Sequence, residues 1–358
     1  MTNHAVPRLG VIGCGHIARF HARNIKDAIS RGGINVDYFA TCDKDLSRAE
    51  SFARIAGCEL VTTDAQALID ACDVVYVCTE TAEHPALVIA AASAGKHIFC
   101  EKPLATSHQA AAVMTEAVIG SGVINQVGLV LNFSPVFSVL KMLMTAEDYG
   151  PVLSVHLRDD QFFPTGDHYG SNWRADVERA GAGTLLEHSI HDVDLLRGLF
   201  GDITAVTCTT REISGHPGIE DVALVRFDHA GGHASTLSSI WHAMPSRQSS
   251  RSLEVFFERA RFTTQDDYFG SITCEIDDQP AVTLSSDEVL ARFMASEGLE
   301  PINEDLRSLG GLCDRRFLEA VCSGQPASPD FSVALTSHAV VDACYRSAAA
   351  DGTLTALS

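Results

Sequence analysis

The sequence is short of basic residues and lacks several patterns that mark other classes of protein. Its 26 lysines and arginines stand against 46 aspartates and glutamates, giving a formal net charge of −20 at pH 7. Nucleic acids and anionic membrane surfaces repel such a chain, so we expect neither as a partner. Segment 1–8 is polar and does not resemble a secretion signal, and no run of about 18 apolar residues predicts a membrane span.

Eleven cysteines are present, but no two of them are spaced as C-x-x-C. This argues against a zinc ribbon or a dithiol redox pair. Several lie in apolar stretches, where a free thiol packs as a small hydrophobic group. We therefore predict reduced cysteines and a cytoplasmic location.

The chain of 358 residues is longer than one hydrophobic core usually serves, so we predict two domains. In the first, residues 1–131, strand-like apolar runs alternate with helical patterns that begin at Ser47, Asp64, Pro85 and Ser107. Alternation of this kind predicts βαβ units and a doubly wound parallel sheet, the Rossmann architecture. The expected strands are 9–13, 36–42, 73–78, 97–100 and 123–130.

Beyond Pro151 the pattern changes to successive strands separated by turns, with few helices before Leu309. Residues 132–358 are therefore predicted to form an α+β domain with a mainly antiparallel sheet. Helical spacing returns at 313–322 and 333–349, and we expect the last helix to pack back near the Rossmann domain.

The segment from Gly13 to Ala18 fits the dinucleotide fingerprint G-x-G-x-x-A between a strand and a helix. A glycine at 13 allows the tight turn, and Gly15 allows the backbone to approach a pyrophosphate at the helix N-terminus, beside His16 and Ile17. The alternative is a chance glycine cluster in a tight turn, against which the preceding strand, the following helix and an acidic residue at the end of the next strand argue.

Asp43 is that acidic residue, and a carboxylate there accepts hydrogen bonds from the ribose 2′-OH and repels a 2′-phosphate. This predicts NAD as the cofactor. Lys44 is within reach of a 2′-phosphate, which leaves NADP open as the alternative.

Two groups of residues are candidates for chemistry. Lys102, in Glu101-Lys102-Pro103, follows the predicted strand 97–100, where a lysine can polarise a substrate oxygen; the alternative is an ordinary solvated loop. Glu187 and His191 are four residues apart, so on one helix they share a face, which Asp194 extends. Histidine is the natural acid or base near neutral pH, and a carboxylate one turn away can orient it.

Two other interpretations of the second group stay open. Its acidic residues could favour a helix N-terminus, or its Glu, His and Asp side chains could bind a metal. Metal sites usually require ligands from a second element, so we expect no metal.

These motifs resemble those of the glucose–fructose oxidoreductase / inositol dehydrogenase / MocA family, usually written Gfo/Idh/MocA. The resemblance covers nearly the whole chain. It includes 13–18; 79–84, where the family has T-P-x-x-x-H; 94–104, close to A-G-K-H-V-x-x-E-K-P-L; the glycine-led 181–194; and 340–347, similar to V-V-x-A-x-x-x-S.

The resemblance implies a Rossmann domain and an open-faced α+β domain that assembles homodimers or homotetramers. It implies Lys102 as the substrate-orienting cation and His191 as the general base, with Glu187 in place of the family's Asp. The expected cofactor-binding residues are Gly13, Gly15, His16, Ile17, Asp43, Lys44, Thr79, His84, Glu101 and Lys102.

Three positions depart from the family pattern. Glu80 replaces a proline, Asn132 stands where relatives often carry arginine, and His188 adds a second imidazole beside Glu187. Losing an arginine argues mildly against a phosphorylated or carboxylated substrate. We expect the substrate to be contacted by Asn132, Trp173, Arg174 and His188, with the loop 162–169, Asp159, Asp160 and His168 as further candidates.

The predicted function is hydride transfer between NAD(P) and a carbinol or carbonyl carbon of a sugar, cyclitol or related polyol. Two alternatives remain: an NAD-dependent glycosidase that uses a transient oxidation, and a non-catalytic NAD-binding regulator. The presence of both Lys102 and His191 argues against the regulator.

Overall fold

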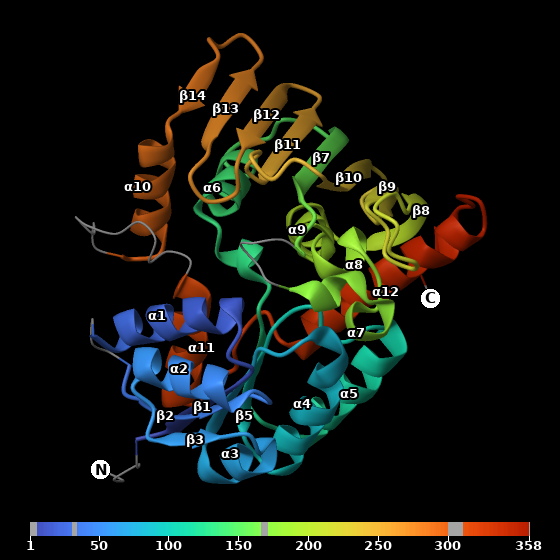
Figure 1. The fold of residues 1–358 in the computed structure, drawn as a ribbon. Coiled ribbons are helices and arrows are strands. Elements are labelled where there is room, and N and C mark those ends of the chain that lie inside the picture. The colour runs from blue at the N-terminus through green and yellow to red at the C-terminus, as the bar shows by residue number, and fades with distance from the viewer. Residues whose placement is uncertain (1–5, 31–33, 166–170, 300–310, 358) are drawn as a thin grey trace. The chain divides into compact units, whose positions relative to one another are not determined.

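The computed structural model describes residues 6–30, 34–165, 171–299 and 311–357 (Figure 1). The chain divides into two compact units. The first unit contains residues 1–129, 178–181 and 307–338, and the second contains residues 130–177, 182–306 and 339–358. Each unit therefore includes segments that are distant in the sequence.

The helices and strands are as follows. The α-helices are α1 (His16–Ser30), α2 (Leu46–Ala56), α3 (Ala65–Ala71), α4 (His84–Ser93), α5 (His108–Ser121), α6 (Pro135–Met144), α7 (Val177–Ala180), α8 (Thr184–Glu187), α9 (Ile190–Phe200), α10 (Ser286–Ser296), α11 (Leu312–Ser323) and α12 (Phe331–Ala349). The strands are β1 (Arg8–Ile12), β2 (Asp37–Cys42), β3 (Leu60–Thr62), β4 (Val74–Val77), β5 (His97–Cys100), β6 (Asn125–Val127), β7 (Val152–Phe162), β8 (Ile203–Arg211), β9 (Val222–His229), β10 (Ala234–His242), β11 (Ser250–Phe257), β12 (Ala260–Gln265), β13 (Ser271–Ile276), β14 (Val282–Leu284) and β15 (Thr355–Ala356).

The first unit is built on a six-stranded sheet in the order β3-β2-β1-β4-β5-β6, and every pairing is parallel. All four residues of β4 are buried, as expected for a strand covered on both faces. Val75 and Val77 pack in a core with α3, α4 and α5, whereas Tyr76 meets Phe317 of α11 on the opposite face. The predicted doubly wound parallel sheet is confirmed (Figure 1).

Helix caps and strand lengths differ in detail from the prediction. The caps predicted at Asp64 and Ser107 are confirmed, but α2 is capped by Asp45, whose carboxylate accepts from the backbone N–H of Ser47. Ser47 is therefore inside the helix, because the aspartate two residues earlier is an equally good cap. The sixth strand has only three residues, since the chain turns at Gly128.

The second unit contains a nine-stranded sheet in the order β14-β13-β12-β11-β7-β10-β9-β8-β15. Only β7 and β10 pair in parallel, so the prediction of a mainly antiparallel sheet is confirmed. Side chains alternate along β10 between buried and half-buried, which indicates one face turned to the core and one toward solvent. Helices α6, α8 and α10 contact the sheet.

Two features of the second unit were not predicted. Helix α10 follows a capping box made by Ser285 and Glu288. The single helix expected to carry both Glu187 and His191 is interrupted: α8 ends at Glu187, and α9 begins at Ile190. The expectation of a shared helical face was therefore wrong, because His188 and Ser189 leave the helical conformation and their side chains bond to the sheet.

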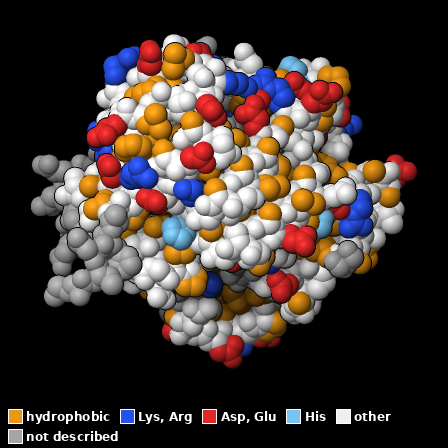
Figure 2. Space-filling model, turned by 90° about the horizontal axis from the view of Figure 1, so that it is seen from below, with side chains coloured by type: hydrophobic (Ala, Val, Ile, Leu, Met, Phe, Trp, Pro, Cys, Tyr) orange, Lys and Arg blue, Asp and Glu red, His pale blue; other side chains and the backbone are white. Residues whose placement is uncertain are grey.

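Three expectations about the surface, the cysteines and membrane-spanning helices can be compared with the structure. On the face that Figure 2 presents, acidic and basic side chains are interspersed among hydrophobic and uncharged ones. The eleven cysteines all lie within the described ranges, and each is a free thiol. Within those same ranges, no helix combines the length and apolar character needed to span a bilayer.

Candidate active site

The carboxyl edge of the first sheet has the geometry of a nucleotide cradle. Gly13 ends β1 with a φ of +91°, and a Cβ there would lie 2.6 Å from the backbone carbon of Cys78 at the end of β4. A side chain at this position is therefore excluded twice, by conformation and by space. At Gly15 no atom lies within 4 Å of the corresponding position, so the backbone at the start of α1 is open to approach. These features fit a bound dinucleotide.

Asp43 is held at the end of β2 by two backbone groups. Its Oδ2 accepts the N–H of Cys14 at 2.8 Å, and its Oδ1 accepts the N–H of Asp45 at 2.9 Å. The carboxylate is thereby tied to the glycine turn itself. Each oxygen keeps a second lone pair, which suits the ribose hydroxyls that the sequence predicts for this residue.

Lys44, the next residue, is engaged by neighbouring carboxylates. Its Nζ lies 3.2 Å from Oε1 of Glu80 and 3.4 Å from Oε1 of Glu83. The other oxygen of Glu80 contacts the guanidinium of Arg179. Burial opposes ionisation of Glu80, but Arg179 and Lys44 hold its pKa below the usual range. Glu80, which stands where the family has proline, is thus an ionised carboxylate that pairs with Lys44.

The turn that carries Lys102 is fastened on both sides by histidines. Nδ1 of His84 lies 2.9 Å from the carbonyl oxygen of Pro103, and its Nε2 lies 3.2 Å from that of Thr79. Nε2 of His338 accepts the N–H of Leu104 at 2.9 Å. Burial lowers the pKa of His338 to about 3, so this ring is neutral and can accept. Thr79 and His84 therefore shape the turn.

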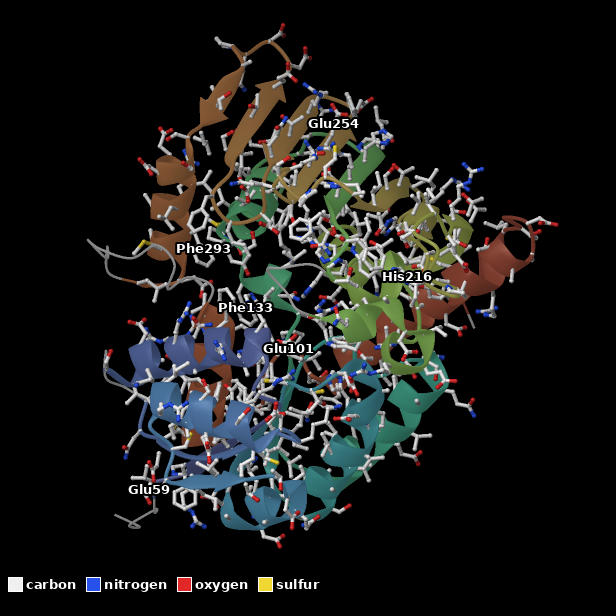
Figure 3. The ribbon with its side chains drawn as sticks, viewed as in Figure 1. Glu59, Glu101, Phe133, His216, Glu254 and Phe293 are labelled. Carbon is white, nitrogen blue, oxygen red and sulfur yellow. The ribbon has the colours of Figure 1, made fainter. Side chains whose placement is uncertain are left out.

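Glu101 precedes Lys102 and is buried at the end of β5, where Figure 3 labels it. Its Oε2 accepts the backbone N–H of Lys102 at 3.2 Å. The position is also crowded, because a Cβ at Gly128 would lie 2.5 Å from Oε1 of Glu101. The conformation of the turn therefore depends on this carboxylate.

In the second unit, the glycine-led segment is anchored by a residue that the sequence analysis missed. Glu220 accepts the N–H of Gly183 at 2.7 Å and that of Leu185 at 2.9 Å. A Cβ at Gly183 would lie 2.5 Å from the backbone nitrogen of Glu220, which excludes any other residue. The position of Glu220 directly before β9 gave no sequence signal for this role.

Glu187 and Asp194 both have polar partners. Oε2 of Glu187 lies 3.2 Å from Nε of Arg174, whose guanidinium also stacks 4.3 Å from the ring of Trp173. Asn132 donates from Nδ2 to Oδ2 of Asp194 at 2.7 Å. His191 is buried on the same helix as Asp194. The structure thus connects Arg174 with Glu187 and Asn132 with Asp194, two pairs that spacing did not predict.

His188 belongs to a buried cluster around Arg251. Its Nε2 lies 2.8 Å from Oδ2 of Asp159 and 3.3 Å from Nη2 of Arg251. Arg251 also donates to Asp192 and contacts Asp267. Asp160 lies on the neighbouring position of β7 and pairs with Arg247.

The expected site residues divide between the two units. Those of the first unit stand at the carboxyl edge of one sheet: Gly13, Gly15, His16, Ile17, Asp43, Lys44, Thr79, His84, Glu101 and Lys102. Those of the second unit are Asn132, Trp173, Arg174, Glu187, His188 and His191. His168 and most of the loop 162–169 lie outside the described residues. Across the part of the chain that the structure describes, no three His, Cys, Asp or Glu side chains are grouped to hold a metal.

Comparisons with known proteins agree with this architecture. A family model described as an oxidoreductase family with an NAD-binding Rossmann fold matches residues 7–129, and the Gfo/Idh/MocA C-terminal domain model matches residues 137–263. Levoglucosan dehydrogenase in complex with NADH has the same fold, with a TM-score of 0.85 at 21% identity over 99% of this chain and 100% of that one.

Curated relatives include inositol dehydrogenases. The scyllo-inositol 2-dehydrogenase (NAD(+)) of Bacillus subtilis (strain 168) is 31% identical over 204 residues, so the alignment spans 56% of either chain, little more than half. The inositol 2-dehydrogenase of Rhizobium meliloti (strain 1021) is 25% identical over 354 residues, 96% of this chain and 97% of that protein.

The fold and the carboxyl edge of its first sheet thus place the chain in a class of oxidoreductases built from two units, of which the first binds a nucleotide. The two family models together match well over half of the chain, and the chain belongs to the Gfo/Idh/MocA oxidoreductase family. Its first unit has the NAD-binding Rossmann fold of that family.

Proposed function

We propose that this protein is an NAD-dependent dehydrogenase that oxidises a secondary hydroxyl of a cyclitol, sugar or related polyol. The observation that carries the proposal is the placing of Lys102 directly after β5, two strands from Gly13, at the same edge of one parallel sheet. In such sheets the nucleotide lies across the carboxyl ends of the strands. A cation fixed there can act on a substrate oxygen beside the nicotinamide.

The substrates named for the relatives support a polyol substrate. The relatives named above act on scyllo-inositol and inositol, and a further solved structure is levoglucosan dehydrogenase in complex with NADH and levoglucosan. Asn132 supports an uncharged substrate, because it is bonded to Asp194 and offers no cation to a phosphate or carboxylate.

The reaction converts a carbinol to a carbonyl. NAD held at the Gly13–Gly15 turn and Asp43 would supply the hydride acceptor for the carbinol carbon. Lys102 donates a hydrogen bond to the substrate oxygen and orients it. His191 takes the hydroxyl proton as general base, so its imidazole becomes cationic. We assign Glu187 to the same site as a supporting carboxylate, whose position is fixed by Arg174 at 3.2 Å.

We assign substrate contacts in the second unit to Asn132, Trp173, Arg174 and His188. Trp173 supplies an aromatic face, stacked on the guanidinium of Arg174, of the kind that covers the apolar face of a sugar ring. His16 and Ile17, at the N-terminus of α1, are assigned to the cofactor with Gly13, Gly15 and Asp43.

We also propose assembly as a homodimer or homotetramer through the solvent-facing side of the nine-stranded sheet. Leu224 on β9 is 51% exposed and points away from the buried side chains of Ala223 and Val225, so it lies on that side of the sheet. A second copy of this chain would cover it. The eleven free thiols support a reducing compartment, the cytoplasm.

The function is tested by following NADH absorbance with NAD and a panel of inositols, anhydrosugars, hexoses and hexose phosphates. Sustained NADH formation with a neutral polyol is the expected result. Glycoside cleavage without net NADH, or NAD binding without turnover of any compound in the panel, would contradict the proposal. Size-exclusion chromatography with light scattering, on wild type and on Leu224→Glu, tests the assembly separately.

A further inference from the structure

His21 lies between two carboxylates that come from distant parts of the chain. Its Nδ1 is 2.7 Å from Oδ1 of Asp314 on α11, and its Nε2 is 3.0 Å from Oε1 of Glu101. All three side chains are buried, with exposed fractions of 3% for His21, 7% for Glu101 and 1% for Asp314. The sequence separations are 293 and 80 residues.

Both contacts are satisfied together only by a charged ring. An ionised carboxylate accepts hydrogen bonds and donates none, and a neutral imidazole carries a single N–H. The imidazolium form has two. Burial opposes the charge, but Asp314 and Glu101 raise the pKa of His21 to about 10. Burial likewise opposes ionisation of Glu101, yet His21 holds the pKa of that carboxyl below its usual range.

The surroundings hold this arrangement in place and exclude water from it. The rings of Tyr76 and Phe99 lie 5.5 Å and 5.0 Å from that of His21, and aromatic faces attract a cation. Asn24, one turn further along α1, donates from Nδ2 to Oδ2 of Asp314 at 2.8 Å. A cation enclosed this way stays paired because no solvent competes for it.

The cluster reaches the Lys102 turn through Glu101. One oxygen of Glu101 faces His21, and the other accepts the backbone N–H of Lys102 at 3.2 Å. The charges balance: two carboxylates, on Asp314 and Glu101, stand against the imidazolium and the ammonium of Lys102. Gly128 leaves the space that the Glu101 carboxylate fills.

We propose that His21 is a permanently charged positioning residue that, through Glu101, fixes the turn carrying Lys102. The second carboxylate, from Asp314, ties this turn to α11. The C-terminal part of the chain therefore contributes to the orientation of a residue more than 200 positions earlier. The inference rests on the proposed function only for its kinetic measurement.

The kinetic test compares His21→Gln with Asp314→Asn and with His97→Gln. His97 is a matched control, because it stands at the opposite end of β5 and its Nδ1 accepts the N–H of Ile124. In His21→Gln we expect kcat to fall about 10- to 100-fold, since misplacement of a reacting group by about 1 Å has effects of that size. NAD affinity, measured by fluorescence titration, should change less than about threefold, because Asp43 and the glycine turn remain intact.

A pH profile separates positioning from a purely structural role. Removing a buried positive charge leaves the Glu101 carboxylate uncompensated, so neighbouring acids lose protons at higher pH. The pH at which kcat/KM falls on the basic side of the profile should therefore be higher in His21→Gln than in wild type. It should be unchanged in His97→Gln and should shift less in Asp314→Asn. A folded His21→Gln protein with unchanged kcat and pH profile would overturn the inference.

A measurement on the wild type does not depend on the folding of any variant. The ring ¹⁵N chemical shifts assigned to His21 at about pH 8.5, two units above the ordinary histidine value, should be those of an imidazolium. A spectrum with neutral rings throughout would refute the charge on His21. Absence of turnover by wild type on every polyol would refute the proposed function instead, and the ring shifts would still decide the state of His21.

Discussion

Nε of Arg251 donates to Oδ1 of Asp192 at 2.7 Å, deep in the second unit, and Asp192 stands next to His191 on α9. The same guanidinium donates from Nη2 to Asp159 at 3.0 Å. The buried carboxyl groups of Asp159 and Asp192 therefore share one guanidinium. A strand and a helix are thus joined by one arginine that binds two carboxyl groups.

The buried carboxyl of Asp192 gives stability a defined dependence on pH. Burial, and then the charge of Asp159 against the opposing effect of Arg251, raise the pKa of Asp192 to about 7 from 3.8. The folded state therefore holds a proton that the unfolded chain releases. The contribution of this group is full below about pH 4 and declines as pH rises to about 7.

We expect Asp192→Asn to remove that decline, because an amide mimics the protonated carboxyl and does not titrate. The free energy of unfolding of wild type and variant is measured by denaturant titration at a series of pH values. Between about pH 4 and pH 7 the wild type should lose on the order of 1–4 kcal/mol more than the variant. Asp160→Asn is the control of opposite sign, since Arg247 lowers the pKa of Asp160 against the effect of burial. Parallel curves for wild type and Asp192→Asn would show that the pKa of Asp192 is not raised in the folded state.

Glu80 is expected to reinforce the preference for NAD. It pairs with Lys44, so Glu80→Gln should leave the ammonium with Glu83 as its one remaining carboxylate partner among those described above, and so more available to a 2′-phosphate. The expected result is a rise of about 3- to 10-fold in kcat/KM for NADP with little change for NAD, because exposed ion pairs are worth less than about 1 kcal/mol. Glu59→Gln, an acidic residue elsewhere in the first unit, controls for net charge. Equal effects of the two substitutions would show that Glu80 has no specific role.

Asp43→Ala should weaken NAD more than NADP. The substitution removes the acceptor expected for the ribose hydroxyl, and it also frees the N–H groups of Cys14 and Asp45. We expect a loss of about 10- to 100-fold in kcat/KM with NAD, corresponding to one or two hydrogen bonds to a charged group. Steady-state kinetics with both cofactors measures the ratio. An equal loss for NAD and NADP would show that Asp43 serves only the turn.

Lys102→Ala and His191→Ala should each abolish turnover while leaving NAD bound. A missing general base or orienting cation typically costs 10²- to 10⁴-fold in rate, whereas the glycine turn that holds the cofactor is unaffected. Turnover is followed as NADH absorbance, and binding by fluorescence titration. Retention of activity in either variant would remove that residue from the mechanism. Lys141→Ala is a suitable control for loss of a positive charge, because Lys141 is an exposed residue of α6.

Most of the first unit could be predicted from local sequence patterns. The glycine turn, Asp43 and the Glu101-Lys102-Pro103 turn were predicted because each depends on residues within a few positions of one another, next to a strand whose apolar run is unmistakable. The caps at Asp64 and Ser107 follow for the same reason. The three-residue strands β3 and β6 are too short to show a period, so their bounds were missed or misplaced.

The second unit was less predictable. Its strands alternate between faces, but β12 to β14 and α10 lie in segments where charged and small residues interrupt the period. Spacing suggested one helix through Glu187 and His191, and the break at His188 and Ser189 comes from side-chain bonds to Asp159 and Ser239 on strands β7 and β10. No local pattern encodes such bonds.

The sequence by itself determined the kinds of element, the nucleotide turn and the residues available for chemistry, because those depend on neighbours along the chain. Only the tertiary structure decided what those residues are bonded to. It placed Asp314 against His21, Glu220 against the glycine-led turn, and Arg251 against Asp192. Buried charges are stable only with partners, and the partners are chosen by packing between segments that are far apart in the chain.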